Sequence, residues 1–287
     1  MSALAIVLNG EVVPAAGARV SVLDRGFLYG DGVSEITRAR HGVPFALERH
    51  LDRLVRSCVE MDLLPPTRES LRADAALALS CLQGEDGEHA ALRFMVTRGV
   101  SGLGLDDVDP NAETTVLVTA RTVLPLDSVV KVRVARAGIP FSGPHGVKTL
   151  AYTGTIAARV QARRRGFDDV LYVDAASRVM EGGSSNVLAI VNGRVRAPVL
   201  GALEGITRGV VLELLSSFGL PVDTGELTWD ELLGADEAFL TSSLRGVAGI
   251  SRIEETALPE LAPVTLRLAQ AYLEHFEEQT EPPARTS

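Results

Sequence analysis

The sequence is poor in cysteine, methionine and aromatic side chains. It has two cysteines, four methionines and one tryptophan among 287 residues. Cys58 and Cys81 lie far apart in apolar, helix-like surroundings, so we expect two buried free thiols rather than a disulfide. A metal site built from cysteine and histidine requires clustered ligands, and the sequence has no such cluster. We therefore expect neither a disulfide scaffold nor a metal centre.

Excess positive charge and long apolar runs are also missing. The formal net charge is −9, which argues against a nucleic-acid partner because phosphate backbones require a basic face. No apolar run is long enough to span a bilayer, and the start, Met1-Ser2-Ala3-Leu4, has no basic-plus-apolar targeting signal. We therefore expect a cytoplasmic protein with no membrane partner.

The glycine-rich motifs of nucleotide-binding folds are absent as well. No Gly-x-Gly-x-x-Gly leads from a strand into a helix, and there is no Walker motif. Hairpin dipeptides such as Asn9-Gly10 recur, and strands and helices do not alternate regularly. The expected fold class is α+β, with mixed or antiparallel sheets and flanking helices in each of two domains. We place the smaller N-terminal α+β domain at residues 1–122, an interdomain linker at 123–128, and the larger C-terminal domain at 129–287.

Hydrophobic periodicity and turn chemistry predict the main elements. Apolar residues at i, i+3, i+4 and i+7 predict a helix over 48–63. Residues 20–23 are expected to continue the first sheet as a strand. Thr207 is expected to cap a helix that ends at Phe218, and Thr228 has capping-box spacing to a glutamate three residues later.

The most informative stretch runs from Gly146 to Asn186. Lys148 lies at a strand-to-helix transition, and Glu181 lies in a Gly/Ser loop just before an apolar strand. Taken alone, Lys148 would be interpreted as an ordinary surface lysine. Its significance depends on the motifs around it.

Six motifs follow one another along the chain at compatible spacings. They are Asp24-Arg25-Gly26 with Gly30-Asp31-Gly32-Val33, Glu48 to Leu54, Val147 to Leu150, Glu181 to Asn186, Gly205-Ile206-Thr207-Arg208, and Thr241-Ser242-Ser243. Over most of its length, the chain resembles the fold-type-IV pyridoxal-phosphate enzymes: the branched-chain aminotransferase, D-amino-acid aminotransferase and aminodeoxychorismate lyase group. The resemblance implies pyridoxal 5'-phosphate as cofactor, a small-molecule amino donor and a 2-oxo acid acceptor as substrates, and a homodimer.

The resemblance also implies roles for individual residues. Lys148, in the C-terminal domain, would form a Schiff base with the cofactor and then move protons as the catalytic residue. Glu181 would keep the pyridine nitrogen protonated, and Arg53 would bind the phosphate together with amides at a helix start. Tyr152 would either bind the ring hydroxyl or pack at a helix start, and Asn186 would order the loop around Glu181. The expected cofactor contacts are Arg53, Lys148, Tyr152, Glu181, Ser185, Asn186, Ile206, Thr207, Ser242 and Ser243.

The substrate side departs from the relatives. Ser34 stands where relatives usually have an aromatic residue, and the loop from Val100 to Leu105 lacks the Arg-x-His pair of the D-amino-acid group. Arg38 and Arg98 are candidates for a substrate carboxylate, in competition with backbone amides at Ser243 and Leu244, and each arginine could equally be a structural ion-pair partner. Three hypotheses stay open: an aminotransferase for an aliphatic or bulky donor, an aminodeoxychorismate lyase that releases pyruvate and 4-aminobenzoate, and a non-catalytic cofactor-binding protein.

Overall fold

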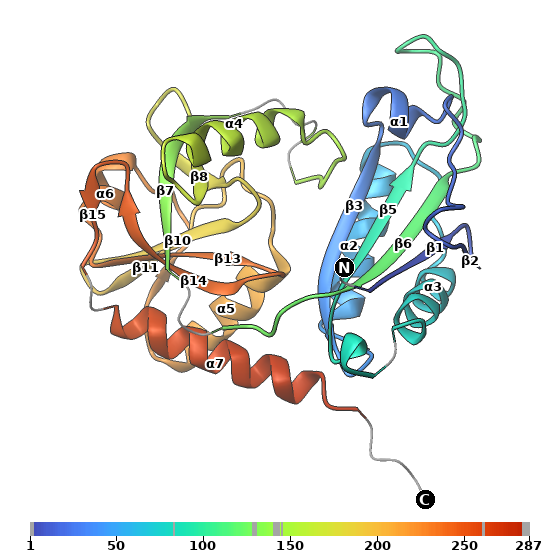
Figure 1. Ribbon diagram of the computed structural model, residues 1–287. Helices are drawn as coiled ribbons and strands as arrows, with labels where there is room; N and C mark the ends of the chain where they lie inside the picture. Colours follow the sequence, from blue (N-terminus) through green and yellow to red (C-terminus); the bar gives the residue numbers. More distant parts are fainter. Residues whose placement is uncertain are drawn as a thin grey trace, which may run out of the picture. The chain divides into compact units, whose positions relative to one another are not determined.

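The computed structural model describes residues 3–82, 84–127, 131–139, 144, 146–259 and 262–282. The chain forms two compact units (Figure 1). Unit 1 comprises Met1–Pro125, Val147–Ala151 and Phe276–Ser287, and unit 2 comprises Leu126–Gly146 and Tyr152–His275. Among the described residues, no helix is both long and apolar enough to cross a membrane.

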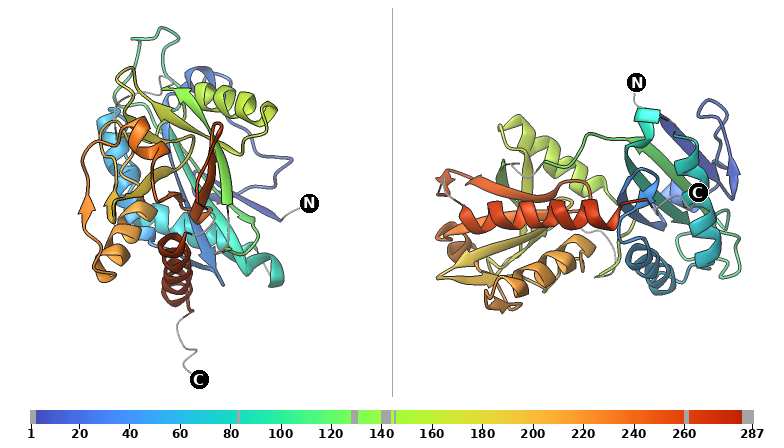
Figure 2. Two further views of the ribbon diagram at one scale, coloured as in Figure 1. Left: turned by 90° about the vertical axis from the view of Figure 1, so that its left-hand side faces the viewer. Right: turned by 90° about the horizontal axis from the view of Figure 1, so that it is seen from below.

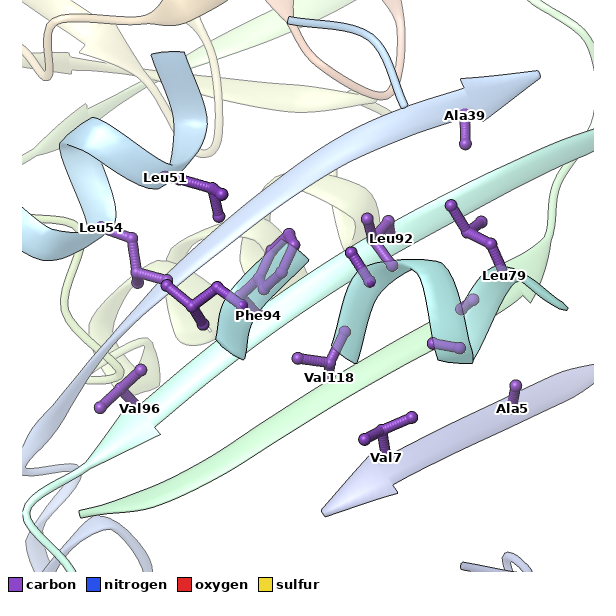
Figure 3. Packing of buried hydrophobic residues seen from close by; sticks show 14 of the residues in the cluster. Ala5, Val7, Ala39, Leu51, Leu54, Leu79, Leu92, Phe94, Val96 and Val118 are labelled. Carbon is purple, nitrogen blue, oxygen red and sulfur yellow. The ribbon is translucent and has the colours of Figure 1, made fainter. Parts of the chain in front are cut away.

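Unit 1 is built on a six-stranded antiparallel sheet with strand order β2-β1-β6-β5-β3-β4. Helices α2 and α3 pack on one face, where Leu51 and Leu54 of α2 meet Phe94 and Val96 of the sheet (Figure 3). Burial of these side chains provides the main stabilisation of the unit. The elements are β1 (Leu4–Leu8), β2 (Glu11–Val12), α1 (Arg25–Tyr29), β3 (Gly32–Arg40), β4 (Val43–Pro44), α2 (Leu47–Glu60), α3 (Arg68–Ser80), η1 (Gly84–Gly87), β5 (His89–Thr97) and β6 (Thr115–Thr122).

Unit 2 is built on a nine-stranded mixed sheet with order β12-β11-β10-β13-β14-β7-β8-β9, and β15 pairs with β14. β7 is parallel to both of its neighbours, β14 and β8. The final helix, α7, is one unbroken helix (Figure 2), and its residues from Phe276 onward belong to unit 1. The elements are β7 (Lys131–Gly138), α4 (Thr153–Arg164), β8 (Asp169–Val173), β9 (Val179–Gly182), β10 (Asn186–Val191), β11 (Arg194–Arg196), α5 (Ile206–Ser217), β12 (Val222–Asp223), α6 (Trp229–Leu233), β13 (Glu237–Ser242), β14 (Gly246–Ile253), β15 (Thr256–Ala257) and α7 (Pro263–Gln279).

The α+β class is therefore confirmed, and local signals placed several elements well. The Asn9-Gly10 turn joins β1 to β2, with both residues at the positive φ that a two-residue hairpin turn requires. The Thr228 capping box is present at α6. β6 ends at Thr122, and residues 123–127 form neither helix nor strand; Ser128 lies outside the described residues.

Three expectations differ from the structure. Residues 20–23 form no strand, because no strand among the described residues pairs with them. All four residues are exposed. Cys81 is exposed at the C-terminal end of α3, whereas Cys58 is buried as expected, and burial raises the pKa of its thiol to about 12. The sequence-based division put 129–287 in one domain, but two segments of it belong to unit 1: Val147–Ala151, which pairs with β3, and Phe276–Ser287.

Candidate active site

Lys148 is held by its backbone against the edge of β3. The Ser34 N–H donates to the Lys148 carbonyl at 2.8 Å, and the Leu150 N–H donates to the Gly32 carbonyl at 2.9 Å. Val33 and Thr149 form an antiparallel bridge between these two bonds. Residues that face each other across an antiparallel pair share one side of the sheet. Lys148 and Ser34 therefore point to the face opposite α2 and α3.

The same face carries other substrate candidates. The strand register places Met95 beside Ser34, and Arg93 beside Ile36. Arg38, two residues further along β3, is buried, and its Nη1 donates to the Leu124 carbonyl at 2.8 Å. Arg93 was not among the residues predicted from the sequence. Counting every second residue along a strand that pairs with β3 is the signal that would have found it.

The face of β3 that packs against α2 carries a buried ionic cluster, which was not predicted from the sequence. Arg53 on α2 donates to Glu35 through Nε at 2.5 Å and Nη2 at 2.8 Å, and His50 Nδ1 lies 2.7 Å from Glu35 Oε2. Burial alone would raise the pKa of the Glu35 carboxyl, but hydrogen bonds from His50 and Arg53 outweigh it and lower that pKa to about 2. Glu35 thus orients Arg53, whose binding of a phosphate stays a prediction.

Arg98 has a structural role in unit 1. Its Nε and Nη2 form a bidentate pair with Asp31 at 2.7 and 3.1 Å, and it also donates to the carbonyls of Met61 and Asp62. Arg25 donates to the same carboxylate. It also donates to the carbonyls of Gly102, Gly104 and Leu105, in the loop that follows β5. For Arg98 the contacts therefore favour the ion-pair interpretation over substrate binding.

In unit 2, Glu181 and Asn186 hold the same loop residue. The Leu203 N–H donates to Glu181 Oε2 at 2.9 Å, and Asn186 Nδ2 donates to the Leu203 carbonyl at 2.7 Å. Glu181 is the last residue but one of β9, and Asn186 is the first residue of β10. These bonds agree with the expectation that Asn186 orders the loop around Glu181.

The start of α5 lies directly after that loop. Its N-cap is Gly205 rather than Thr207, and the helix has no side-chain cap and no acidic residue in its first turn. A Cβ at Gly205 would lie 1.9 Å from Asn186 Oδ1, so a larger residue here would have to displace the Asn186 side chain. Thr207 is instead the second helical residue and is buried. A helix start without an acidic cap presents free amide dipoles suited to an anion.

The turn between β13 and β14 completes this part of unit 2. Asn186 pairs with Thr241 across β10 and β13, and Ser242 ends β13 before the half-buried Ser243 and Leu244. Among the described residues, the hydroxyl oxygens of Ser185 and Thr241 are buried without a hydrogen-bond partner, as is that of Ser34 in unit 1. Buried polar atoms without a partner are rare in folded proteins, so these hydroxyls are suited to a ligand.

Comparison with known proteins identifies the family. The model of the family "Amino-transferase class IV" matches residues 32–253. The chain belongs to the class IV aminotransferases. It is 33% identical to a putative branched-chain-amino-acid aminotransferase of Methanocaldococcus jannaschii over 93% of this chain and 94% of that protein. It is 30% identical to the aminodeoxychorismate lyase of Bacillus subtilis over 87% of each.

Solved structures agree on the fold of this class IV aminotransferase. The branched-chain aminotransferase of the archaeon Thermoproteus uzoniensis, crystallised with norvaline, matches with a TM-score of 0.86 and 28% identity. The match covers 98% of this chain and 97% of the other. The protein is therefore a PLP-dependent transaminase of class IV, and pyridoxal 5'-phosphate (PLP) is its cofactor.

The residues of this transaminase fit PLP in each unit. Unit 1 provides Lys148 on a sheet face beside the buried hydroxyl of Ser34, which has no hydrogen-bond partner in the described part of the chain. Unit 2 provides the Glu181 carboxylate, which suits a pyridine nitrogen. It also provides the uncapped start of α5 and the turn Ser242–Leu244, here called the serine turn, which suit a phosphate. Tyr152 stands at the N-cap position of α4 and is half-buried, and its bond to the ring hydroxyl stays a prediction.

Proposed function

We propose that this protein transfers the amino group of an aliphatic amino acid to a 2-oxo acid. The observation that carries the proposal is the shared sheet face of Lys148 and Ser34, which also bears Ile36 and Met95. A small side chain at position 34 leaves room for substrate, and the apolar neighbours suit an aliphatic group. Arg38 and Arg93 on the same face supply positive charge near the substrate, and the backbone amides of Ser243 and Leu244 in unit 2 receive its carboxylate.

Each residue has a defined task in this reaction. When bound, PLP supplies an aldehyde that condenses with amines and a ring that takes up electron density. The Lys148 Nζ holds the cofactor at rest and then moves the proton of the substrate Cα. The Glu181 carboxylate keeps the pyridine nitrogen protonated. The amides of Ile206 and Thr207 and the hydroxyl of Ser243 bind the phosphate, together with Arg53.

Two related activities receive less support. The loop to which Arg25 donates contains neither the arginine nor the histidine of the Arg-x-His pair that the D-amino-acid group carries there. Aminodeoxychorismate lyase remains the second candidate, because the Bacillus subtilis relative carries that activity in its name. It would use the same lysine to release pyruvate and 4-aminobenzoate.

A single-turnover experiment tests the proposal. The PLP-loaded protein is mixed with L-leucine, L-valine, their D-enantiomers or aminodeoxychorismate in the absence of an oxo acid, and cofactor absorbance is followed. We expect an aliphatic amino acid to convert the cofactor fully to pyridoxamine 5'-phosphate, which 2-oxoglutarate then reconverts. Return to the starting spectrum with release of pyruvate, and no need for an acceptor, would instead identify the lyase.

Exposed apolar side chains in unit 1 support a homodimer. They lie in two segments, residues 20–29 and 100–108, which Arg25 joins by donating to the carbonyls of Gly102, Gly104 and Leu105. Large apolar patches on a folded surface mark interaction sites, and a twofold dimer would cover the patch with a second copy. We define this apolar patch as Val20, Val22, Leu23, Phe27, Leu28, Tyr29, Val100, Leu103, Leu105 and Val108.

Replacement of Leu105 by aspartate should therefore weaken the dimer. Leu105 is 77% exposed, so the change costs little within one chain but places a charge in the proposed interface. Sedimentation equilibrium should show a dimer for the wild type and a shift toward monomer for Leu105→Asp. Leu124→Asp is the matched control, since Leu124 is 84% exposed but lies outside the apolar patch. A wild-type protein that sediments as a monomer would contradict the proposal.

A further inference from the structure

Asp169 is a buried carboxylate in unit 2 to which the proposed reaction assigns no task. It is the first residue of β8, and its side chain is 0% exposed. Its Oδ2 accepts a hydrogen bond from Arg245 Nη1 at 2.7 Å, and its Oδ1 lies 3.4 Å from Arg159 Nε. Oδ1 also accepts the Val170 N–H at 3.0 Å. Both carboxylate oxygens are thus occupied by donors from separate parts of the unit.

The two arginines come from segments that adjoin ligand-binding candidates. Arg245 lies in the turn between β13 and β14, directly after Leu244. Arg159 lies on α4, and its Nη1 donates to Ser184 Oγ at 3.1 Å. Ser184 belongs to the loop that follows Glu181 and β9. One carboxylate therefore connects the serine turn to the loop beside Glu181.

The charge balance of this cluster favours a role in orientation. A buried ion pair is weak evidence for stability, because removing charges from water costs about as much as their attraction returns. Two guanidinium groups share one carboxylate, and their side chains stay 24% and 28% exposed for Arg159 and Arg245. The cluster thus keeps positive charge beside the turn, which favours an approaching carboxylate.

We propose that Asp169 is a positioning residue that fixes both loops at once. Through Arg245 it sets the Ser242–Leu244 turn, whose backbone amides receive the substrate carboxylate. Through Arg159 and Ser184 it sets the Gly183–Ser185 loop, and with it the geometry of Glu181 at the pyridine nitrogen. The proposal rests on the function proposed above for this turn and this loop.

Two binding measurements separate the two arms. The first is the dissociation constant of 4-methylpentanoate, an unreactive aliphatic carboxylate, from its effect on cofactor absorbance in the holoenzyme. The second is the dissociation constant of PLP from the apoenzyme. Asp169→Asn should raise both by about tenfold, the size expected when charged hydrogen bonds are lost. Arg245→Gln should raise the constant for 4-methylpentanoate by a similar factor and, through the Ser243 hydroxyl, also raise the constant for PLP. Arg159→Gln should raise the constant for PLP and leave that for 4-methylpentanoate unchanged.

The controls use neighbouring positions. Asp168→Asn removes the adjacent carboxylate, whose hydrogen bonds go to Arg133 at the surface and which acts on Arg245 only through its charge, so it should change both constants far less than Asp169→Asn. Asp169→Glu restores the charge and should recover most of the binding, since both guanidinium groups are exposed enough to shift. If Asp169→Asn does not fold, the two arginine variants decide, because each leaves Asp169 one partner.

The outcomes also separate this proposal from the proposed function. A variant Asp169→Asn that melts at lower temperature but binds 4-methylpentanoate and PLP like the wild type would show a structural brace only and overturn the proposal. The proposed function is tested on the wild type, through formation of pyridoxamine 5'-phosphate. Wild-type turnover with unaltered binding in all three variants would remove the positioning role and leave the transaminase intact.

Discussion

Lys148→Ala should abolish transamination while the protein still folds. Lys148 is anchored through its backbone carbonyl, which accepts the Ser34 N–H, so truncation of its side chain leaves the pairing with β3 intact. Loss of the amine removes both the covalent attachment of PLP and the base that moves the Cα proton. We expect the turnover rate to fall by about 10³-fold or more and the absorbance band of lysine-bound cofactor to disappear.

The composition of the chain makes this test unusually sharp. The sequence contains only two lysines, Lys131 and Lys148. Borohydride reduction of the holoenzyme, followed by peptide mass analysis, must therefore place the cofactor on one of two side chains or on the N-terminal amine. Lys131→Ala is the matched control and should keep the band and the turnover. Labelling of Lys131, or a band that persists in Lys148→Ala, would remove Lys148 from the reaction.

Local signals in the sequence predicted secondary-structure elements and motifs better than they predicted contacts between residues distant in sequence. Asn9-Gly10 and the Thr228 capping box are set by a few adjacent residues, and both formed as expected. Thr207 was expected to cap α5, but the cap is Gly205, where any side chain would have to displace that of Asn186. That constraint comes from a strand distant in sequence. No local pattern could reveal it.

The same limit applies to the site. Lys148 and Glu181 were predicted because their motifs resemble a family, and Ser34 was singled out as a departure from it; their roles stay predictions. Glu35, Asp169 and Arg245 carry no motif, and their importance depends on which charges the fold brings to them. For Arg98 the sequence left a substrate role and a structural ion pair both open, and only the bidentate bond to Asp31 favours the ion pair. Which charged side chains meet depends on the tertiary fold, so no local sequence pattern shows it.

Glu35→Gln should cause the largest loss of stability among substitutions outside the catalytic group. The change leaves the Arg53 guanidinium buried without its carboxylate, and breaking a buried pair in this way costs about 3–5 kcal/mol. Urea unfolding at neutral pH measures the loss. Glu48→Gln is the control on the same helix, since Glu48 pairs with Arg72 in an exposed setting and should matter little. Equal destabilisation by the two variants would show that Glu35 is not a structural centre.

The Glu35 carboxyl should also make the free energy of unfolding depend on pH. Its pKa is lowered from 4.5 to about 2 in the folded protein, so Glu35 stabilises the fold fully above pH 4.5. This contribution of about 3 kcal/mol is lost as the pH falls from 4.5 to 2, because the unfolded chain takes up the proton first. Wild-type stability should therefore fall more steeply with acid over this window than that of Glu35→Gln. Because Glu35 also orients Arg53, the affinity for PLP should decline in the variant even at neutral pH, which connects the buried cluster to the phosphate that Arg53 is proposed to bind.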